Sequence, residues 1–371
     1  MRRLFTVAEL IADRDVHVIV TCGTGGVGKT SVSAALALAA AESGRHVALV
    51  TVDPAKRLAT ALGLDHLGGD PQPVPGVSGG SLDALMLDMT QTFDDAVRSH
   101  APRNRVDEVL RNPFYKALST SFSGTQDYMA TEKLGQLYEQ AQATSRWDLI
   151  VVDTPPSRSA LDFLDAPARL DRLAEGPVLQ LLAPSSGPLK LIGAGLSQVT
   201  WLISKVIGSK ALADLQVFAS AFESVMGGFR RRASRVRTLL ASPAAAFVIV
   251  ASPRRAALDE ARFFVGQLRD RGTTARGVVV NKVSEAVCLS PDAEEALRSA
   301  PDAYHWWRTS WVTWRAQRAR MLTALPTTLP VTLVRTLGRE VTDLDVVREL
   351  GSVLVDGAVL AEEDDGPVGD I

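Results

Sequence analysis

The stretch "VHVIVTCGTGGVGKTSVSAALALAAAESG", residues 16–44, decides the fold. It opens with an apolar, β-branched run at 16–22, continues through a glycine-rich turn, and ends in an alanine-rich run at 32–44. Gly44 stands where the C-terminal cap of a helix is expected. The stretch therefore predicts a buried strand, a tight loop and a helix, in that order.

The glycine-rich turn fits the pattern G-x-x-x-x-G-K-[ST] without a gap, from Gly23 to Thr30. A loop of this kind binds phosphate because its backbone N–H groups point inward and the following helix aims its N-terminus at the anion. Lys29 is expected to reach the β- and γ-phosphate oxygens and Thr30 to ligate magnesium. The alternative is a glycine turn that binds nothing. The residues predicted to bind the nucleotide are Gly23, Thr24, Gly25, Gly26, Val27, Gly28, Lys29, Thr30, Ser31 and Asn281.

Further short apolar runs recur between longer helical ones. They lie at 46–53, 84–89, 148–153, 246–252, 277–281 and 330–334. Strands that are apolar along their whole length are covered on both faces, which is typical of a parallel sheet flanked by helices. The predicted fold class is α/β: a doubly wound, mostly parallel sheet with a P-loop NTPase core and an inserted helical subdomain.

The same patterns predict how the chain is organised. We expect one P-loop ATPase domain over residues 1–356 and an acidic, disordered tail over 357–371. Within the domain, the nucleotide core is expected at 16–89, 146–160 and 246–350, and the helical subdomain at about 90–145 and 161–245. The Gly/Pro-rich residues 68–80 predict a mobile loop.

Composition excludes several classes of protein. A net charge of −2 over 371 residues does not indicate a nucleic-acid partner. Cys22 and Cys288 are the two cysteines, too few for a disulfide framework or a self-contained zinc site. The apolar residues 189–208 include two lysines, so no integral membrane span is expected, and charged residues interrupt the N-terminus where a signal peptide would be apolar. The expected location is the cytoplasm.

Two acidic residues follow predicted strands. Asp53 ends the second strand and Asp153 follows "LIVV". Because the carboxyl ends of parallel strands surround the ligand crevice, Asp53 is expected to orient the attacking water and Asp153 to lie near magnesium. Catalysis is accordingly assigned to Asp53 and Lys29, and metal binding to Thr30, Asp53 and Asp153. Helix capping is the alternative role for both aspartates.

Asn281-Lys282 follows "GVVV", where a base-recognition motif is expected. GTPases carry N-K-x-D there, but the fourth residue in this chain is Ser284, which offers no carboxylate to guanine. ATP is therefore favoured over GTP, with Asn281 hydrogen-bonding the adenine edge.

The motifs "GGVGKT", "VDPAKRL", "VVDTPPSRSALDFLDAP", "VVVNK" and "LPVTLVRTLG" occur in an order that resembles the ArsA family of arsenite-pump and tail-anchored-protein-targeting ATPases. The resemblance spans roughly residues 16–350 and is greatest to single-domain actinobacterial members. It implies that Asp53 is the water-activating aspartate of switch I, that Asp153 opens switch II, and that Asn281 contacts adenine. It also implies a dimer with ATP at its interface, in which the nucleotide state opens or closes a hydrophobic surface.

The chain departs from the family pattern at two places. Thr24 stands where the family carries a signature lysine that reaches the partner's phosphates, and no C-x-x-C follows the N-K motif to clamp zinc. Three states remain open: a heterodimer with a paralogue that retains the lysine, a slowly hydrolysing homodimer, or a monomer. Metalloid binding requires clustered thiolates, so arsenite transport is not expected.

Three functions remain open: an ATPase switch that shields hydrophobic client helices, a weakly hydrolysing regulatory subunit, or a ParA/MinD-like partitioning ATPase. The apolar residues 178–208 predict either subdomain core or a groove for a client helix. The tryptophan-rich residues 304–320 predict a core-facing helix, with a partner- or membrane-binding helix as the alternative. The arginine-rich residues 222–240 predict a solvated helix face.

Overall fold

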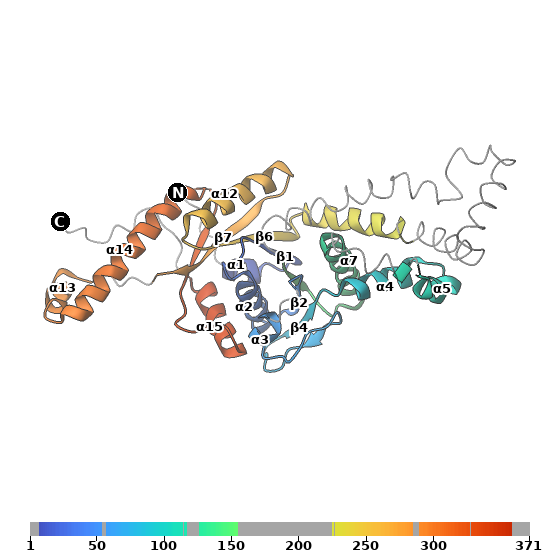
Figure 1. Cartoon of the computed structure of the whole chain (residues 1–371), viewed down its shortest axis with the longest axis horizontal. Coiled ribbons are helices and arrows are strands. Elements are labelled where there is room, and N and C mark those ends of the chain that lie inside the picture. Colours follow the sequence, from blue (N-terminus) through green and yellow to red (C-terminus); the bar gives the residue numbers. More distant parts are fainter. Residues whose placement is uncertain are drawn as a thin grey trace. The chain divides into compact units, whose positions relative to one another are not determined.

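The computed structural model of the chain describes residues 7–53, 57–113, 115–116, 126–154, 225, 227–284, 289–326 and 328–357, drawn in colour in Figure 1. The chain divides into two compact units. The first comprises Met1–Met86, Ala141–Leu161 and Leu240–Ile371, and the second Leu87–Gln140 and Asp162–Leu239. The predictions for residues 161–208, Cys288 and the tail beyond residue 357 fall outside the described residues.

A single eight-stranded sheet organises the first unit, in the order β3-β4-β2-β5-β1-β6-β7-β8. Its strands are β1 (Val18–Cys22), β2 (His46–Thr51), β3 (Gln72–Pro73), β4 (Ser81–Met86), β5 (Leu149–Asp153), β6 (Ala245–Ala251), β7 (Ala275–Val283) and β8 (Val331–Arg335). Neighbouring strands run parallel except β3 and β4, which are antiparallel. The α/β prediction with a mostly parallel sheet is confirmed.

The strand order reverses beside β1. From β1 the chain builds β2 and β4 on one side and later β6, β7 and β8 on the other. In open α/β sheets, ligands bind beyond the carboxyl ends of the strands at such a switch point. The loop that follows β1 begins at this point.

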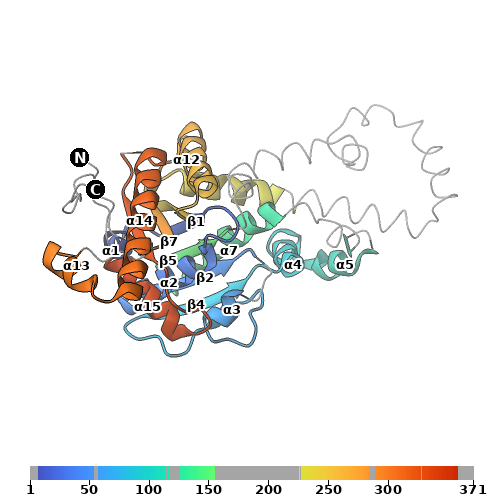
Figure 2. The ribbon, with the colours of Figure 1, turned by 60° about the vertical axis from the view of Figure 1, so that its left-hand side comes forward.

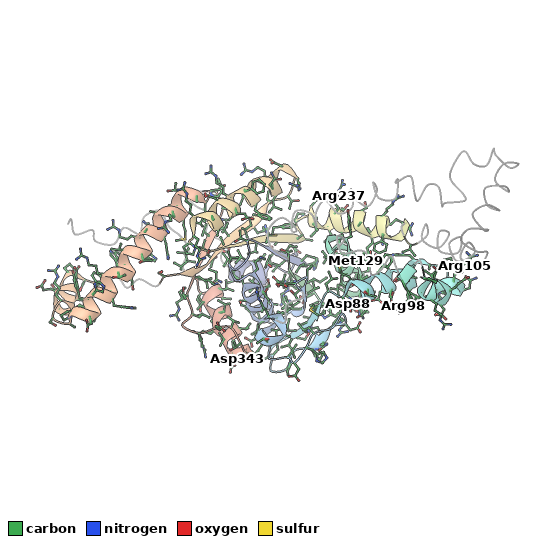
Figure 3. The ribbon with its side chains drawn as sticks, viewed as in Figure 1. Asp88, Arg98, Arg105, Met129, Arg237 and Asp343 are labelled. Carbon is green, nitrogen blue, oxygen red and sulfur yellow. The ribbon has the colours of Figure 1, made fainter. Side chains whose placement is uncertain are left out.

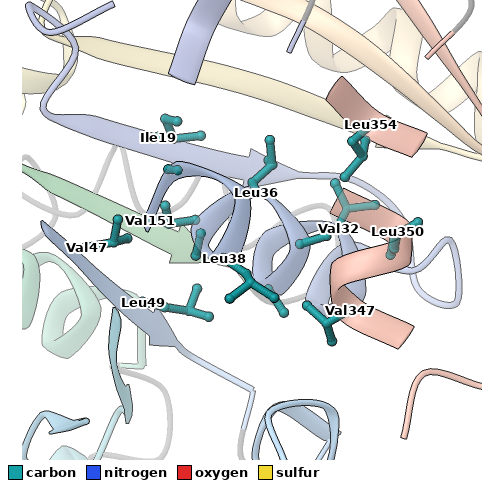
Figure 4. Close-up of a cluster of buried hydrophobic side chains, with 14 of the residues drawn as sticks. Ile19, Val32, Leu36, Leu38, Val47, Leu49, Val151, Val347, Leu350 and Leu354 are labelled. Atoms are coloured by element: carbon teal, nitrogen blue, oxygen red, sulfur yellow. The ribbon is translucent and has the colours of Figure 1, made fainter. Parts of the chain in front are cut away.

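Helix α2 (Lys29–Glu42) forms the centre of the core beside the sheet. Its alanine-rich sequence lets it pack closely against the strands and against α15 (Leu344–Val355). Figure 4 shows Val32 and Leu36 of α2 with Leu350 of α15 and Ile19 of β1 in the same buried cluster. The helix ends as predicted: Gly44 adopts a left-handed φ of 86°, which a glycine adopts without strain.

The remaining helices of the first unit are α1 (Val7–Ala12), α3 (Arg57–Ala61), α12 (Arg255–Asp270), α13 (Pro291–Leu297) and α14 (Pro301–Ala324). Helix α12 packs on β6 and β7 and beside α14 (Figure 2). Asp343 begins α15 as an N-cap, because its carboxylate accepts a hydrogen bond from Val346 N at 2.9 Å. Asp88 caps α4 of the second unit in the same way, on Gln91 N at 2.9 Å; both aspartates are labelled in Figure 3.

The described part of the second unit is helical. It contains α4 (Met89–His100), the 3-10 turn η1 (Arg103–Arg105), α5 (Val106–Arg111), most of α7 (Gln126–Thr144) and a helix over 227–240. The expectation of a solvated arginine face on the last helix is wrong for one residue. Arg232 is buried and forms ion pairs with Glu132 and Glu139 of α7, since its position faces that helix.

Two further predictions need correction. Residues 68–80 are not loop throughout, because Gln72 and Pro73 pair with β4 as a short edge strand, a position where the missing N–H of proline is tolerated. Helix α14 is not core-facing over its length, since Met321 is its one buried residue and Trp306 is 64% exposed. Tyr304, Trp307, Trp311 and Trp314 share one face of the helix and lie against one another, with neighbouring ring centroids 5.3–6.5 Å apart. None of the described helices is long and apolar enough to cross a membrane.

Candidate nucleotide-binding site

The glycine loop connects β1 to α2, and its glycines are required for two different reasons. A Cβ on Gly23 would lie 2.1 Å from the Val250 carbonyl oxygen, and one on Gly28 would lie 2.4 Å from Asn281 Nδ2. By contrast, a Cβ on Gly25 or Gly26 would meet no atom within 4 Å. The loop is thus packed tightly against β6 and β7 at its two ends and is open at its middle, where a ligand has room.

Lys29 lies at the first position of α2 with only 8% of its surface exposed. Its Nζ donates to the Thr24 carbonyl oxygen at 2.8 Å. Burial lowers the pKa of the Lys29 ammonium, and the negative charges of Asp153 and Asp53 act in the opposite direction. No side chain caps α2 at Gly28, so the first turn presents its N–H groups beside this cation.

Asp153 ends β5 and is fully buried at the first turn of α2. Its Oδ2 accepts hydrogen bonds from Thr30 Oγ1 at 2.8 Å and from Thr51 Oγ1 at 2.9 Å. Burial raises the pKa of the Asp153 carboxyl, while the Thr30 and Thr51 hydroxyls counteract that rise by stabilising the charged form. A threonine hydroxyl and a carboxylate oxygen this close together are hard oxygen donors of the kind that Mg²⁺ prefers.

Three residues of this network were not predicted from the sequence. Thr51 Oγ1 contacts both Asp153 and Asp53 N, the latter at 3.2 Å. Ser33 Oγ lies 3.4 Å from Asp153 Oδ1, and Thr154 Oγ1 donates to Thr21 O at 2.7 Å. A polar Ser33 in an otherwise alanine-rich buried helix was the available signal, because buried hydroxyls are placed where they find partners.

Asp53 follows β2 and is half-buried. Its charge acts on the pKa values of both Lys29 and Asp153, which places it in the same electrostatic neighbourhood. The structure thus brings Lys29, Thr30, Asp53 and Asp153 together at the carboxyl ends of the central strands β1, β2 and β5. Residues 54–56 and 155–159, which follow Asp53 and Asp153 in the sequence, lie outside the described residues.

Asn281 and Lys282 reach the loop from β7. Asn281 Nδ2 donates to the Val27 carbonyl oxygen at 2.9 Å, and Lys282 Nζ donates to the Gly26 carbonyl oxygen at 2.9 Å. The Asn281 side chain is itself fixed, because Oδ1 accepts from Lys282 N at 2.9 Å. The structure places the Asn281 amide against the loop, and its contact with adenine stays a prediction.

Cys22 ends β1 directly before the loop and is buried. Burial raises the pKa of its thiol to about 12, with Lys29 and Thr154 acting in the opposite direction. A thiol with so high a pKa is neutral and poorly nucleophilic at physiological pH. Among the described residues, no three His, Cys, Asp or Glu side chains cluster as metal ligands.

The glycine loop connects the first strand of a parallel sheet to a helix, and Thr30 at its end donates to a buried aspartate of a neighbouring strand. This arrangement defines a P-loop NTPase. Residues 16–292 match the family of anion-transporting ATPases, the ArsA ATPases. Because the match covers more than half of the chain, the chain belongs to this family, and the resemblance inferred from the motifs is confirmed.

Individual relatives are distant. The chain is 34% identical over 149 residues to the arsenical pump-driving ATPase of Escherichia coli. The matched segment covers 39% of this chain and 24% of that protein. The chain is 28% identical over 302 residues to Protein Rv2184c of Mycobacterium tuberculosis, covering 77% of this chain and 62% of that protein. The chain is 24% identical over 293 residues to ATPase get3 of Schizosaccharomyces japonicus, and the match covers 78% of this chain and 80% of that protein. The chain therefore spans less than two thirds of the length of the first two relatives.

Proposed function

We propose that this protein is a magnesium-dependent ATP hydrolase that acts as a molecular switch. The observation that carries the proposal is the direct contact of Thr30 with the buried Asp153 carboxylate beside the buried Lys29 ammonium. Burying a cation and an anion at the opening of a glycine loop is costly, and such groups cluster where a protein binds or transforms a ligand. Membership of an ATPase family supports the same activity.

Each part of the site has a separate role in binding or hydrolysis of ATP. The open middle of the loop and the first turn of α2 receive the phosphates, and Lys29 exchanges its hydrogen bond to Thr24 O for one to a β- or γ-phosphate oxygen. Thr30 and Asp153 hold Mg²⁺, directly or through water; when bound, the ion neutralises charge on the phosphates. Asp53 orients a water for in-line attack on the γ-phosphorus and accepts its proton as the bond to the β-phosphate oxygen breaks, which yields ADP and phosphate.

The switch extends beyond the site. The nucleotide core at 16–89, 146–160 and 246–350 binds ATP, and the helical subdomain at about 90–145 and 161–245 changes position with the nucleotide state. Nucleotide binding is coupled to dimerisation, and the hydrophobic surface that opens takes an amphipathic or transmembrane client helix in the cytoplasm. Relatives named ATPase get3 and arsenical pump-driving ATPase, matched over parts of their length, support the family-level part of this proposal.

Thr24 favours a second candidate. Without a lysine at this position, the chain offers no cation to a partner's phosphates, so on its own it hydrolyses ATP weakly. Beside a lysine-bearing paralogue it serves as a regulatory subunit whose own site receives the paralogue's lysine. A partitioning ATPase of the ParA/MinD type is less favoured, since the net charge of −2 gives no general attraction to DNA.

Steady-state hydrolysis and equilibrium binding of ATP with Mg²⁺ test the proposal, with the mass in solution recorded with and without ATP. The wild type binds Mg-ATP and releases phosphate, whereas Lys29→Ala loses both activities. Lys116→Ala, which removes an exposed lysine of the other unit, leaves both unchanged. A wild-type chain that binds no ATP overturns the proposal, and one that binds ATP without turnover supports the regulatory subunit.

A further inference from the structure

The end of β7 holds two consecutive carbonyl groups of the glycine loop. Lys282 Nζ donates to Gly26 O, and Asn281 Nδ2 donates to Val27 O, both at 2.9 Å. A Cβ on Gly28 would lie 2.4 Å from Asn281 Nδ2, so the amide approaches this closely because residue 28 is glycine. Two neighbouring side chains of one strand therefore bind two neighbouring peptide groups of another element.

These contacts determine where the loop amides point. A trans peptide is planar, and its C=O and N–H groups point in opposite directions. Holding Gly26 O therefore directs the N–H of Val27 away from Lys282, and holding Val27 O directs the N–H of Gly28 away from Asn281. Both N–H groups then point to the side of the loop opposite to β7, as a phosphate cradle requires.

The segment that makes these contacts is held in an unfavourable conformation. Lys282 has a φ of 63°, in the left-handed region that non-glycine residues seldom adopt. The next residue but one, Ser284, is fixed by a reciprocal pair of hydrogen bonds with Gln317 of α14, each of 2.9 Å. Strained backbone persists where surrounding contacts enforce it, and an observed outlier of this kind supports a functional hypothesis.

We infer that Lys282 and Asn281 are positioning residues for the triphosphate: they hold the carbonyls of Gly26 and Val27 so that the Val27 and Gly28 N–H groups are aligned before the phosphates arrive. The inference rests on the proposed function of the loop. It differs from base recognition, because it assigns both side chains to the phosphate end of the ligand. Prealigned amides raise affinity because the ligand does not bear the cost of ordering them.

Two ligands separate the two roles. Inorganic tripolyphosphate occupies a phosphate cradle and has no base, whereas ATP has both parts. Lys282→Gly removes the ammonium, and glycine adopts the left-handed backbone without strain, so the variant is expected to fold. Lys282→Arg keeps a cation that can donate to Gly26 O. Arg276→Met removes an exposed cation from the other end of β7 and serves as the matched control.

We expect Lys282→Gly and Asn281→Ala to weaken binding of Mg-ATP and of Mg-tripolyphosphate by the same factor, about 10-fold each. Lys282→Arg recovers most of the loss for both ligands, and Arg276→Met binds both as the wild type does. Calorimetric titration measures the affinities, and thermal unfolding shows that Lys282→Gly remains folded. If a variant loses affinity for ATP alone, the replaced side chain contacts the base in the wild type, and this result overturns the inference.

Unchanged affinity of Lys282→Gly for both ligands also overturns the inference while leaving the proposed function intact. If the wild type binds neither ligand, the proposed function fails and the inference fails with it. If the wild type binds both ligands and Lys29→Ala binds neither, the loop is the binding site, and the Lys282 variants alone decide the inference.

Discussion

The hydroxyl of Thr30 lies 2.8 Å from Asp153 Oδ2, although 123 positions separate the two residues in the sequence. The contact joins the start of α2 to the end of β5 across the switch point of the sheet. Thr51 donates to the same oxygen at 2.9 Å from the end of β2. Three elements thus meet on one buried carboxylate, and changes to that carboxylate have specific expected effects.

Asp153→Asn removes the charge and keeps the shape. Its side chain no longer offers Mg²⁺ an anionic oxygen, so we expect Mg-dependent hydrolysis to fall by about 100-fold or more. The asparagine keeps an oxygen that can accept from the Thr30 and Thr51 hydroxyls, so we expect the variant to remain folded. Hydrolysis assays over a range of Mg²⁺ concentrations and thermal unfolding measure the two effects. Asp270→Asn, at the exposed end of α12, is the control and changes neither. Unchanged hydrolysis by the Asp153→Asn variant would show that Asp153 does not hold the metal.

Asp53→Asn tests the assignment of the catalytic base. An asparagine cannot accept the proton of the attacking water, so kcat is expected to fall by about 100- to 10,000-fold. The affinity for ATP stays near that of the wild type, because Asp53 is assigned to the water and not to the phosphates. Single-turnover hydrolysis and equilibrium binding separate the two quantities. Asp65→Asn, at an exposed position after α3, should behave as the wild type. A parallel loss of binding and turnover contradicts the assigned role.

Thr24→Lys tests whether a cation is missing at the dimer interface. Cations supplied in trans are worth about 10³–10⁵ in rate in comparable phosphoryl-transfer enzymes. We therefore expect the variant to hydrolyse ATP much faster than the wild type, with a specific activity that rises with protein concentration as dimers form. Thr24→Gln, of similar length but uncharged, shows no gain. If the wild type is already fast and the lysine adds nothing, the argument for a heterodimer fails.

Much of the fold could be predicted from the sequence, because its signals are local. Apolar runs of strand length, the glycine loop and the capping Gly44 each depend on neighbouring residues. The contacts of the site depend on register between distant elements, and so Thr51 and Ser33 were missed as partners of Asp153. The exposure of α14 could not be predicted either, since a helical period identifies an apolar face but not whether the same chain covers it.

Arg45 illustrates a stabilising group that local patterns do not reveal. It is fully buried, and its guanidinium donates to Asp148 Oδ1 at 2.7 Å and to the carbonyl oxygens of Ile11, Asp13, Val16 and Asp148 at 2.8–3.3 Å. Arg45→Met leaves the buried carbonyl oxygens without a donor, whereas the Asp148 carboxylate is partly exposed and keeps its ion pair with Arg14. We therefore expect the free energy of unfolding to fall by about 2–3 kcal/mol.

Urea unfolding at neutral pH measures the effect of Arg45→Met. Arg45→Lys recovers little of the loss, because a single ammonium cannot reproduce the forked geometry of the guanidinium. Arg348→Met is the matched control: its partners Glu42 and Asp345 lie on a partly exposed surface, so we expect a change of about 1 kcal/mol or less. Equal losses of unfolding free energy for Arg45→Met and Arg348→Met would show that the buried contacts of Arg45 stabilise the fold no more than surface ion pairs do.

His100 predicts a pH dependence of stability in the second unit. Its ring lies against the helix over 227–240, where a Cβ on Gly228 would be 2.1 Å from its Cγ. Burial lowers the His100 pKa, as do the positive charges of Arg232 and Arg231, while Glu139 acts in the opposite direction. The folded protein therefore holds His100 neutral at a pH where the unfolded chain, with a histidine pKa of about 6.5, binds a proton. The stabilising contribution of neutral His100 is present above about pH 6.5 and is lost as the pH falls through the lowered pKa.

The measurement is the difference in unfolding temperature between wild type and His100→Asn from about pH 8 to about pH 5. We expect the difference to be largest at high pH and to shrink as the pH falls, since the asparagine does not titrate. Glu132 has a pKa raised by burial and gives a slope of the opposite sign, but it does so in both proteins and cancels in the difference. Thr238→Ala, at an exposed position on the helix over 227–240, is the control, because it removes no titratable group. A pH-independent difference for His100→Asn would show that the ring stabilises the helices by packing alone.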